Sequence, residues 1–330
     1  MKTFDYHLAE SPADAVATLT AHPDAAYLAG GTNLVDHMKL GVAAPDLLVD
    51  VSRLDLDEIA PLDGGVRIGA TVRNSDLAAD PLIRSRYPVL ARALLSAASG
   101  QLRHAATTAG NLLQRTRCVY FQDVTTPCNK RNPGTGCSAI GGYVRYHAIL
   151  GASPHCVAAH PSDMAVAMAA LDAVIVVEGS GGEHRIPIDD FYRLPGDEPH
   201  RDTVLEHGEL ITAVELPPPP SEAVSDYRKI RDRASYAFAL VSVAAEVSVT
   251  DNDEISSARV ALGGIAHKPW RARKAEEVLV GAPATDDTFA AAARAELADA
   301  EPLPGNEFKV ELARRAIIAE LRTLTERSRR

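Results

Sequence analysis

Four cysteines in one short segment are the feature that most limits how this chain folds. Cys118, Cys128, Cys137 and Cys156 are its only cysteines, and nine, eight and eighteen residues separate them in turn. Most zinc sites contain closely spaced pairs of ligands, and this segment has none. The spacing alone therefore leaves open buried apolar cysteines, two disulfides, or a metal centre with four thiolate ligands.

The sequence between the cysteines favours the metal centre. Residues 129–142 read NKRNPGTGCSAIGG, with four glycines and few side chains that build a hydrophobic core. Ordering each residue costs about 1–2 kcal/mol, so such a segment needs a strong local link. Four thiolates suit a tetrahedral zinc ion or an iron–sulfur cluster, and glycines let backbone amides approach cluster sulfides. We therefore expect His147, His155 and His160 to be structural or to shield the cluster rather than to bind metal.

The composition is that of a globular protein and excludes several classes. Of 330 residues, 46% are hydrophobic and 24% charged, and the net charge of −10 disfavours nucleic acid and anionic membranes as partners. The most apolar stretch, Met164–Val177, is interrupted by Asp172, so no membrane span is expected. The first ten residues lack the apolar segment of an export signal. We expect a cytoplasmic chain, or one exported while bound to a partner that carries a signal.

Two polar motifs indicate where a ligand binds. Residues 28–34 (LAGGTNL) place a Gly-Gly turn after a predicted strand, and the amides of such a turn form an anion-binding nest, although a plain tight turn has the same sequence. Residues 107–112 (TTAGNL) suit a second phosphate or ring contact, or a capped turn. Residues 134–139 match the spacing of a dinucleotide fingerprint, but no strand precedes them and Cys137 lies inside, so we reject that match.

Strands and helices alternate before residue 217. A helix is expected to begin at Ser11–Pro12, and another to run from Pro161 to Leu171. Four prolines at 217–220 cannot continue a helix or a sheet, so we place a domain boundary there. Strands are expected at 26–28, 46–51 and 66–70 in a mixed sheet, and at 173–177, 185–188 and 210–216.

A small α+β domain is expected after the boundary. The pattern predicts three strands followed by three helices. The last helix has an apolar stripe typical of a core-facing helix. The expected strands are 226–230, 237–249 and 258–262, and the expected helices are 272–280, 286–297 and 306–324.

Together these motifs resemble the FAD-binding medium subunit of the molybdenum hydroxylases, the family of xanthine dehydrogenase and carbon monoxide dehydrogenase. The resemblance rests on residues 27–34 (YLAGGTNL), residues 107–112 (TTAGNL) and Pro161-Ser162-Asp163 before a helix. The cysteine-bearing segment resembles the bacterial aldehyde oxidoreductases whose flavin subunit carries an additional [4Fe-4S] cluster.

The resemblance implies an α+β fold with two domains. A two-part FAD-binding domain of the vanillyl-alcohol-oxidase (PCMH) type would span residues 1–220, with an iron–sulfur insertion at about 113–160. A small C-terminal domain of the CO dehydrogenase flavoprotein type would span residues 221–330.

The resemblance also assigns roles to individual residues. Asp163 would lie near the adenine-side ribose and diphosphate, Ile211 would pack on the flavin or adenine side, and Lys229 would contact the isoalloxazine. The family commonly has a glycine where this chain has Ala109. The four cysteines would ligate the cluster. The remaining FAD-binding positions would be Leu28, Ala29, Gly30, Gly31, Thr32, Asn33 and Leu34 at the pyrophosphate and Thr107, Thr108, Gly110 and Asn111 at the phosphates and flavin.

The implied function is electron transfer within a heterotrimeric molybdenum-containing aldehyde oxidoreductase. Substrate would be oxidised on a molybdopterin-binding large subunit, and electrons would pass through [2Fe-2S] centres of a small subunit to the FAD of this chain and then to an external acceptor. No residue of this chain would act as a substrate acid or base, because the cofactors carry the redox chemistry. The alternatives are a stand-alone FAD-dependent oxidase or dehydrogenase and a zinc-stabilised binding module.

Overall fold

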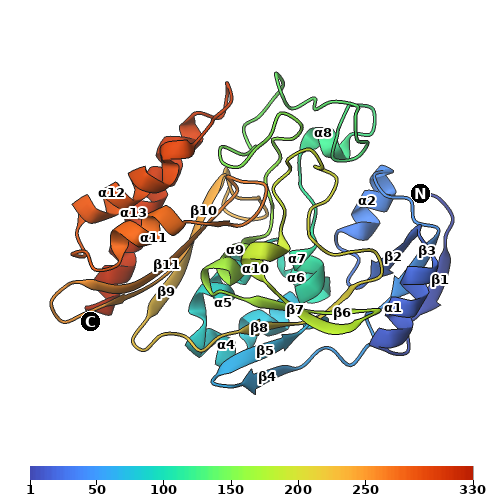
Figure 1. Ribbon diagram of the computed structural model, residues 1–330, viewed down its shortest axis with the longest axis horizontal. Helices are drawn as coiled ribbons and strands as arrows, with labels where there is room; N and C mark the ends of the chain where they lie inside the picture. The colour runs from blue at the N-terminus through green and yellow to red at the C-terminus, as the bar shows by residue number, and fades with distance from the viewer. Residues whose placement is uncertain (330) are drawn as a thin grey trace.

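The structure is a computed structural model that describes residues 1–329. It is an α+β fold with three separate sheets, which follow one another along the chain (Figure 1). The N-terminal sheet lies at one end of the molecule, and the C-terminal sheet with its helices lies at the other. The cysteine-bearing segment runs as an irregular chain along one edge, between these two ends.

The first sheet is parallel because helices connect its strands. Strands β1 (Asp5–Leu8), β3 (Leu47–Asp50) and β2 (Ala25–Leu28) lie side by side in that order. Parallel neighbours need a crossover connection, which here contains α1 (Pro12–Ala21) or α2 (Leu34–Leu40). Ser11 accepts a hydrogen bond from the amide of Asp14 and Pro12 occupies the first turn, so the expected start of this helix is confirmed.

The second sheet is antiparallel throughout its five strands, in the order β4-β5-β8-β6-β7. The expectation of one mixed sheet is therefore wrong. The strand expected at 66–70 starts a new sheet because a tight turn at Asp63-Gly64, both with positive φ, pairs it with its predecessor as a hairpin. The strands are β4 (Ile59–Leu62), β5 (Gly65–Gly69), β6 (Val174–Gly179), β7 (Gly182–Pro187) and β8 (Leu210–Leu216).

Short helices pack on this second sheet and build the main core. The apolar helix α9 (Asp163–Ala170) is buried along its whole length, as a helix surrounded by other elements must be. The other helices of this part are α3 (Asn74–Ala79), α4 (Pro81–Arg86), α5 (Pro88–Ser96), α6 (Gly100–Ala105), α7 (Thr108–Leu112) and α10 (Ile188–Phe191). Helix α8 (Val119–Gln122) instead lies in the cysteine-bearing segment, away from this sheet (Figure 1).

The third sheet and three helices form the C-terminal part, where the three expected strands and three expected helices are present and the two-residue strand β12 is an addition that the sequence did not predict. The antiparallel strands lie in the order β12-β11-β10-β9, and the helices cover one face of them (Figure 1). The elements are β9 (Val224–Ile230), β10 (Val241–Val249), β11 (Ile255–Gly263), β12 (Trp270–Arg271), α11 (Arg273–Leu279), α12 (Asp286–Glu296), the 3₁₀ turn Leu297–Asp299 and α13 (Phe308–Ser328).

The C-terminal sheet and α9 share one hydrophobic core. Tyr227, Ala244 and Ala261 from three strands of that sheet belong to the same buried cluster as Met164 and Met168 of α9. Because this core is continuous, the two parts of the chain are held in a fixed relation around the segment between them. That relation positions the candidate site described below.

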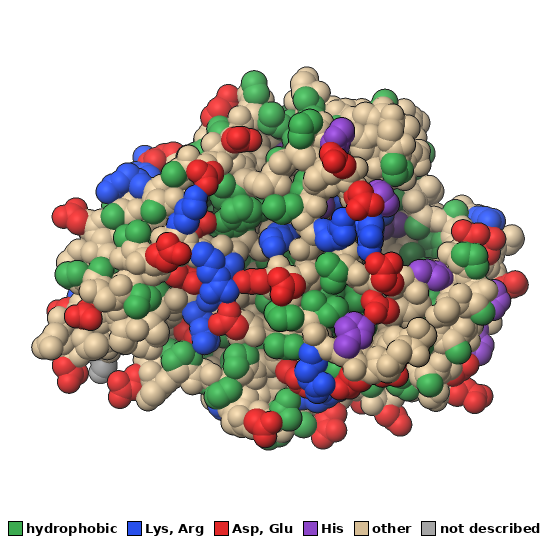
Figure 2. Space-filling model, viewed as in Figure 1, with side chains coloured by type: hydrophobic (Ala, Val, Ile, Leu, Met, Phe, Trp, Pro, Cys, Tyr) green, Lys and Arg blue, Asp and Glu red, His purple; other side chains and the backbone are tan. Residues whose placement is uncertain are grey.

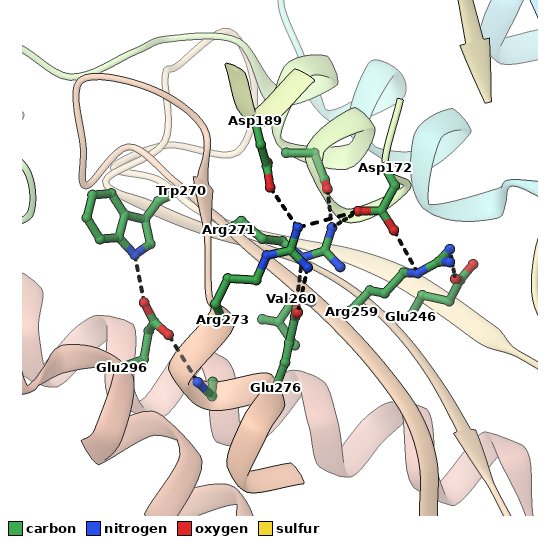
Figure 3. A network of polar contacts seen from close by, with 12 residues as sticks. Asp172, Asp189, Glu246, Arg259, Val260, Trp270, Arg271, Arg273, Glu276 and Glu296 are labelled. Atoms are coloured by element: carbon green, nitrogen blue, oxygen red, sulfur yellow. Dashed lines mark hydrogen bonds and ion pairs between the residues drawn. The ribbon is translucent and has the colours of Figure 1, made fainter. Parts of the chain in front are cut away.

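Ion pairs reinforce the same contact (Figure 3). Arg271 of β12 donates to the backbone carbonyl of Ala169 at 2.6 Å and to Asp172 at 2.5 Å, and it also pairs with Glu276 of α11. Arg259 of β11 pairs with Asp172 at 3.0 Å. The Arg271 side chain is only 6% exposed, so these charges are paired in a partly water-excluded environment.

Charges of both signs are spread over the surface. Acidic side chains are scattered across the face in Figure 2, while Lys and Arg gather near its middle with acidic side chains beside them. Among residues 1–329, no helix is long and apolar enough to cross a membrane.

Candidate functional site

A cavity of about 770 Å³ lies between the N-terminal part, the cysteine-bearing segment and the C-terminal sheet. We call it the central cavity. Its volume falls within the range of about 300–1,000 Å³ that is typical of cofactor and ligand sites. The expected FAD-binding residues that line it are Gly31, Thr32, Asn33, Gly110, Asn111 and Asp163.

The Gly-Gly turn is held against α6. A β-carbon on Gly30 would lie 1.9 Å from the carbonyl oxygen of Ala105, so no larger residue fits without moving backbone. Gly31 has a φ of +71°, a conformation that glycine adopts without strain. Gly31, Thr32 and Asn33 thereby reach the cavity wall, whereas Gly30 packs behind them.

The two threonines of the second motif are structural. Thr107 accepts a hydrogen bond from the amide of Gly110 and caps α7, and the Thr108 hydroxyl donates to the carbonyl of Val72 at 3.1 Å. Both side chains are buried, and neither lines the central cavity. Ala109 has an ordinary negative φ, so its β-carbon causes no backbone strain.

Asn111 connects the second motif to the start of α9. Its amide donates to Asn74 at 2.6 Å, and its side-chain oxygen accepts from the hydroxyl of Ser162 at 2.7 Å. Ser162 in turn caps α9 by accepting from the amide of Ala165. This network fixes the polar floor of the cavity, because buried polar groups are stable only when they are hydrogen-bonded.

Asp163 and Lys229 form a buried ion pair. Lys229 Nζ lies 2.7 Å from Asp163 Oδ2 and donates to the carbonyl of Ser96, and the two side chains are 3% and 4% exposed. Tyr227 donates its hydroxyl to Asp163 Oδ1 at 2.5 Å, and burial next to this carboxylate raises the pKa of the phenol well above its usual value. Lys229 therefore contacts Asp163 and is not among the residues that line the central cavity, and its contact with a flavin ring stays a prediction.

Several other expected contacts also lie outside the cavity wall. Ile211 is buried in the core of the second sheet, where it pairs with Val177. Leu28 ends β2, and Ala29 packs against the core of the first sheet. Leu34 is the first residue of α2, and like Ile211, Leu28 and Ala29 it is not among the residues that line the central cavity.

Cationic and aromatic side chains complete the cavity wall. Lys39, Arg103 and Arg117 bring positive charge to it. Arg117 pairs with Asp36 at 2.9 Å and lies over the ring of Phe238, with 5.3 Å between guanidinium and ring centre. Such a wall suits a ligand with an anionic part and a planar part.

Several buried polar atoms in this wall have no partner within residues 1–329. An unpaired buried donor or acceptor costs about 1–3 kcal/mol, so a ligand that pairs with these atoms would be stabilised. The atoms are Asn33 Nδ2, Asn74 Nδ2, Arg117 Nε, His147 Nδ1, His160 Nε2 and Ser242 Oγ.

The four cysteines converge on a single small pocket, which we call the cysteine pocket. Cys128 and Cys137 pair across an antiparallel β-bridge, and Cys156 pairs with Ser153 in the same way. All four cysteines are free of disulfides, which removes that alternative. Within the described part of the chain, no three His, Cys, Asp or Glu side chains lie close enough to hold one metal ion.

The thiols of the cysteine pocket are desolvated. Burial raises the pKa of Cys118 to about 12 and that of Cys156 to about 11. Thiolates are therefore disfavoured in this pocket until a cation binds them.

Charged side chains help to order the cysteine-bearing segment, together with buried apolar ones such as Phe121 and Val144. Lys130 lines the cysteine pocket, is 1% exposed, and pairs with Asp202 and the carbonyl of Pro199. Arg131 donates to the carbonyls of Tyr120 and Phe121. The polar sequence of residues 129–142 is thus compatible with an ordered segment, although it builds little core.

The two sites share a wall. Thr116 and Cys118 line both the central cavity and the cysteine pocket. The chain therefore places the central cavity and the cysteine pocket next to each other.

Comparison with known proteins decides the family. Residues 2–219 match the model described as the FAD binding domain in molybdopterin dehydrogenase, and residues 225–321 match the CO dehydrogenase flavoprotein C-terminal domain. The chain belongs to the FAD-binding subunits of the molybdenum hydroxylase family. It is accordingly an oxidoreductase subunit with an FAD-binding domain.

Individual relatives of this FAD-binding subunit cover almost the whole chain. It is 53% identical to the aldehyde oxidoreductase FAD-binding subunit PaoB of Escherichia coli strain K12, over 97% of this chain and 98% of that protein. It is 30% identical to the glyceraldehyde dehydrogenase medium chain of Sulfolobus acidocaldarius, over 86% of this chain and 83% of that protein. The solved carbon monoxide dehydrogenase of Hydrogenophaga pseudoflava superposes with a TM-score of 0.77 at 26% identity, covering 98% of each chain.

The central cavity fits the FAD of this family. Its unpaired polar atoms can pair with ribose, phosphate and ring groups, and its cations suit a diphosphate. Sequence analysis missed Arg117, Phe238, His160 and Ser242 as wall residues, because they come from segments far apart in the chain. Of these four residues, the sequence analysis names only His160, as a structural or cluster-shielding residue and not as part of a cavity wall.

Proposed function

We propose that this FAD-binding subunit also binds a [4Fe-4S] cluster and serves a molybdenum-containing aldehyde oxidoreductase of three subunits. The convergence of all four cysteines on one pocket beside the central cavity carries this proposal. The relative of 53% identity is named an aldehyde oxidoreductase subunit, which supports aldehydes as the substrate class.

The pocket geometry supports a cluster over a single zinc ion. Zinc holds its sulfur ligands at about 2.3 Å, so the four sulfurs of a zinc site lie close together. No such close group exists within residues 1–329, yet Cys118, Cys128, Cys137 and Cys156 face one pocket. A cube with an iron atom at each ligand position takes four thiolates that lie farther apart than the ligands of a single metal ion.

Within this proposal, residues 1–220 form the FAD-binding domain, residues 113–160 the iron–sulfur insertion, and residues 221–330 the C-terminal domain. The bound FAD would supply electron transfer between the centres of the complex and an external acceptor. The chain's own residues bind and orient it: Gly31, Thr32 and Asn33 would hold its diphosphate. Asp163, fixed by Lys229 and Tyr227, would supply a fixed acceptor at the cavity wall.

The partners in this proposal are a molybdopterin-binding large subunit and a [2Fe-2S] small subunit. Membership in the molybdenum hydroxylase family supports them, since the relative of 53% identity is itself named as a subunit of an aldehyde oxidoreductase. The stand-alone oxidase alternative lacks such support. Co-expression with the neighbouring genes followed by affinity purification tests the assembly, and recovery of this chain alone, loaded with FAD, would contradict it.

Replacing one cysteine tests the cluster. In Cys137→Ser, iron and acid-labile sulfide should fall from about four per chain to nearly none, while FAD stays bound, because Cys137 lines the cysteine pocket and not the central cavity. Metal analysis and the flavin absorption of anaerobically purified protein measure both. Ser138→Ala, a change in the adjacent wall residue, is the matched control and should keep its iron. Four irons in the Cys137 variant would refute the ligand assignment.

A further inference from the structure

His147 lies at the wall between the central cavity and the cysteine pocket. Its Nε2 is 3.1 Å from the sulfur of Cys118, and the residue is 4% exposed. The same residue lines the central cavity. Among residues 1–329, it is the histidine that contacts a cysteine of the pocket, since His155 instead faces Asp197 at the surface and His160 packs against Tyr192.

Residues from the C-terminal part fix this histidine in place. The carbonyl of His147 accepts a hydrogen bond from Lys309 Nζ at 2.7 Å and another from Asn306 Nδ2 at 3.3 Å. Its amide donates to the carbonyl of Val144. The backbone of His147 is thus held from both sides, and the buried position of the residue restricts the movement of its ring away from Cys118.

The orientation of the ring defines its chemical role. Nδ1 is buried and has no partner within the described residues, whereas Nε2 faces the sulfur. A thiolate accepts hydrogen bonds, so the tautomer that carries its proton on Nε2 satisfies this contact. The other ring edge then presents an acceptor to the surroundings of the central cavity.

We infer that His147 is a positioning residue for the cysteine pocket. Its Nε2 donates a hydrogen bond to the Cys118 thiolate, and this hydrogen bond raises the reduction potential of the cluster. The inference rests on the proposed function, because it requires a cluster in this pocket. Reduction adds negative charge that spreads to the ligand sulfurs, and a hydrogen bond to sulfur stabilises the reduced form more than the oxidised form.

Removal of the donor tests this inference. In His147→Phe and His147→Leu the potential of the cluster, measured by redox titration followed by electron paramagnetic resonance, should become more negative by about 59 mV, a tenfold shift of a one-electron equilibrium. His147→Gln, whose amide is again a donor, should recover part of the shift. The matched control is His155→Leu, which changes an exposed histidine in the same segment and should leave the potential unchanged.

Iron content separates the failure of this inference from the failure of the proposed function. Wild-type protein without iron would overturn the cluster itself and the inference with it. Full iron with an unchanged potential in the Phe or Leu variant would overturn the inference alone. Loss of iron from both variants, with the His155 control intact, would also overturn it, because His147 would then be a structural contact. When only one of the variants His147→Phe and His147→Leu keeps its iron, the reduction potential of the cluster in that variant tests the inference.

Discussion

At the scale of single residues, the candidate site is organised by the pairing of buried charges. Asp163 lies at the start of the buried helix α9, where an unpaired carboxylate would be very costly. Lys229 and Tyr227 approach it from β9 and satisfy both of its oxygens. The family resemblance predicts roles at the FAD for Asp163 and Lys229, but their mutual contact depends on how β9 packs against α9, which no local pattern reveals.

We expect this pairing to dominate the effect of substitution at Lys229. Lys229→Met leaves Asp163 buried without its cation and should destabilise the protein by about 3–5 kcal/mol. The double variant Lys229→Met/Asp163→Asn removes both charges and should regain a large part of that loss. Chemical denaturation of the three proteins measures the coupling, and FAD content is read in parallel. Additive effects of the two substitutions would contradict a direct ion pair.

At the scale of elements, the Gly-Gly turn shows what sequence can and cannot predict. The turn after β2 and the start of α2 follow from residues 28–34 alone, because glycines there break the strand. The requirement for glycine at position 30 comes from a tertiary contact, because α6 passes so close that a β-carbon on this residue has no room. The helices between 74 and 112 were not predicted; four of them have only five or six residues, too few to show a clear helical period, whereas α5 has nine residues and an apolar face that the sequence analysis missed.

Substitution at Gly30 should therefore disturb the turn much more than its small size suggests. Gly30→Ala places a methyl group against the Ala105 carbonyl and must displace backbone, at a cost of about 1–3 kcal/mol or more. We expect a lower melting temperature and at least a tenfold weaker FAD affinity, measured by fluorescence titration of the apoprotein. Gly100→Ala in α6 meets no atom within 4 Å and is the control, with stability equal or slightly higher. Equal FAD affinity in both variants would show that the turn does not hold the cofactor.

At the scale of the whole molecule, the cysteine-bearing segment depends on distant parts of the chain. Lys130 pairs with Asp202, and the C-terminal helix α13 holds His147 through Lys309. The sequence indicated an insertion that needs a metal to be ordered. It did not indicate these anchors, because buried lysines are rare and a charged residue in a helix is normally expected at the surface.

Lys309 should make the stability of the molecule depend on pH. Burial lowers the pKa of Lys309 from 10.5 to about 7. Between these values the unfolded chain binds the proton that the folded chain has lost, so stability rises with pH, whereas below pH 7 both states are protonated and the contribution is constant. Lys309 should raise the free energy of unfolding by at most about 3 kcal/mol between pH 7 and pH 9.5.

The difference in melting temperature between wild type and Lys309→Met isolates this contribution, because other titrating groups are common to both proteins. We expect the difference to shift by several degrees in favour of wild type from pH 7 to pH 9.5, measured by calorimetry. Lys274→Met is the control: its ammonium group is exposed and paired with Asp299, which raises its pKa, so it stays charged over this range and its curve should run parallel to that of wild type. Parallel curves for Lys309→Met as well would mean that Lys309 keeps its charge in the folded protein. The tether between α13 and His147 would then be a charged ammonium group, held by the carbonyls of His147 and Gly264.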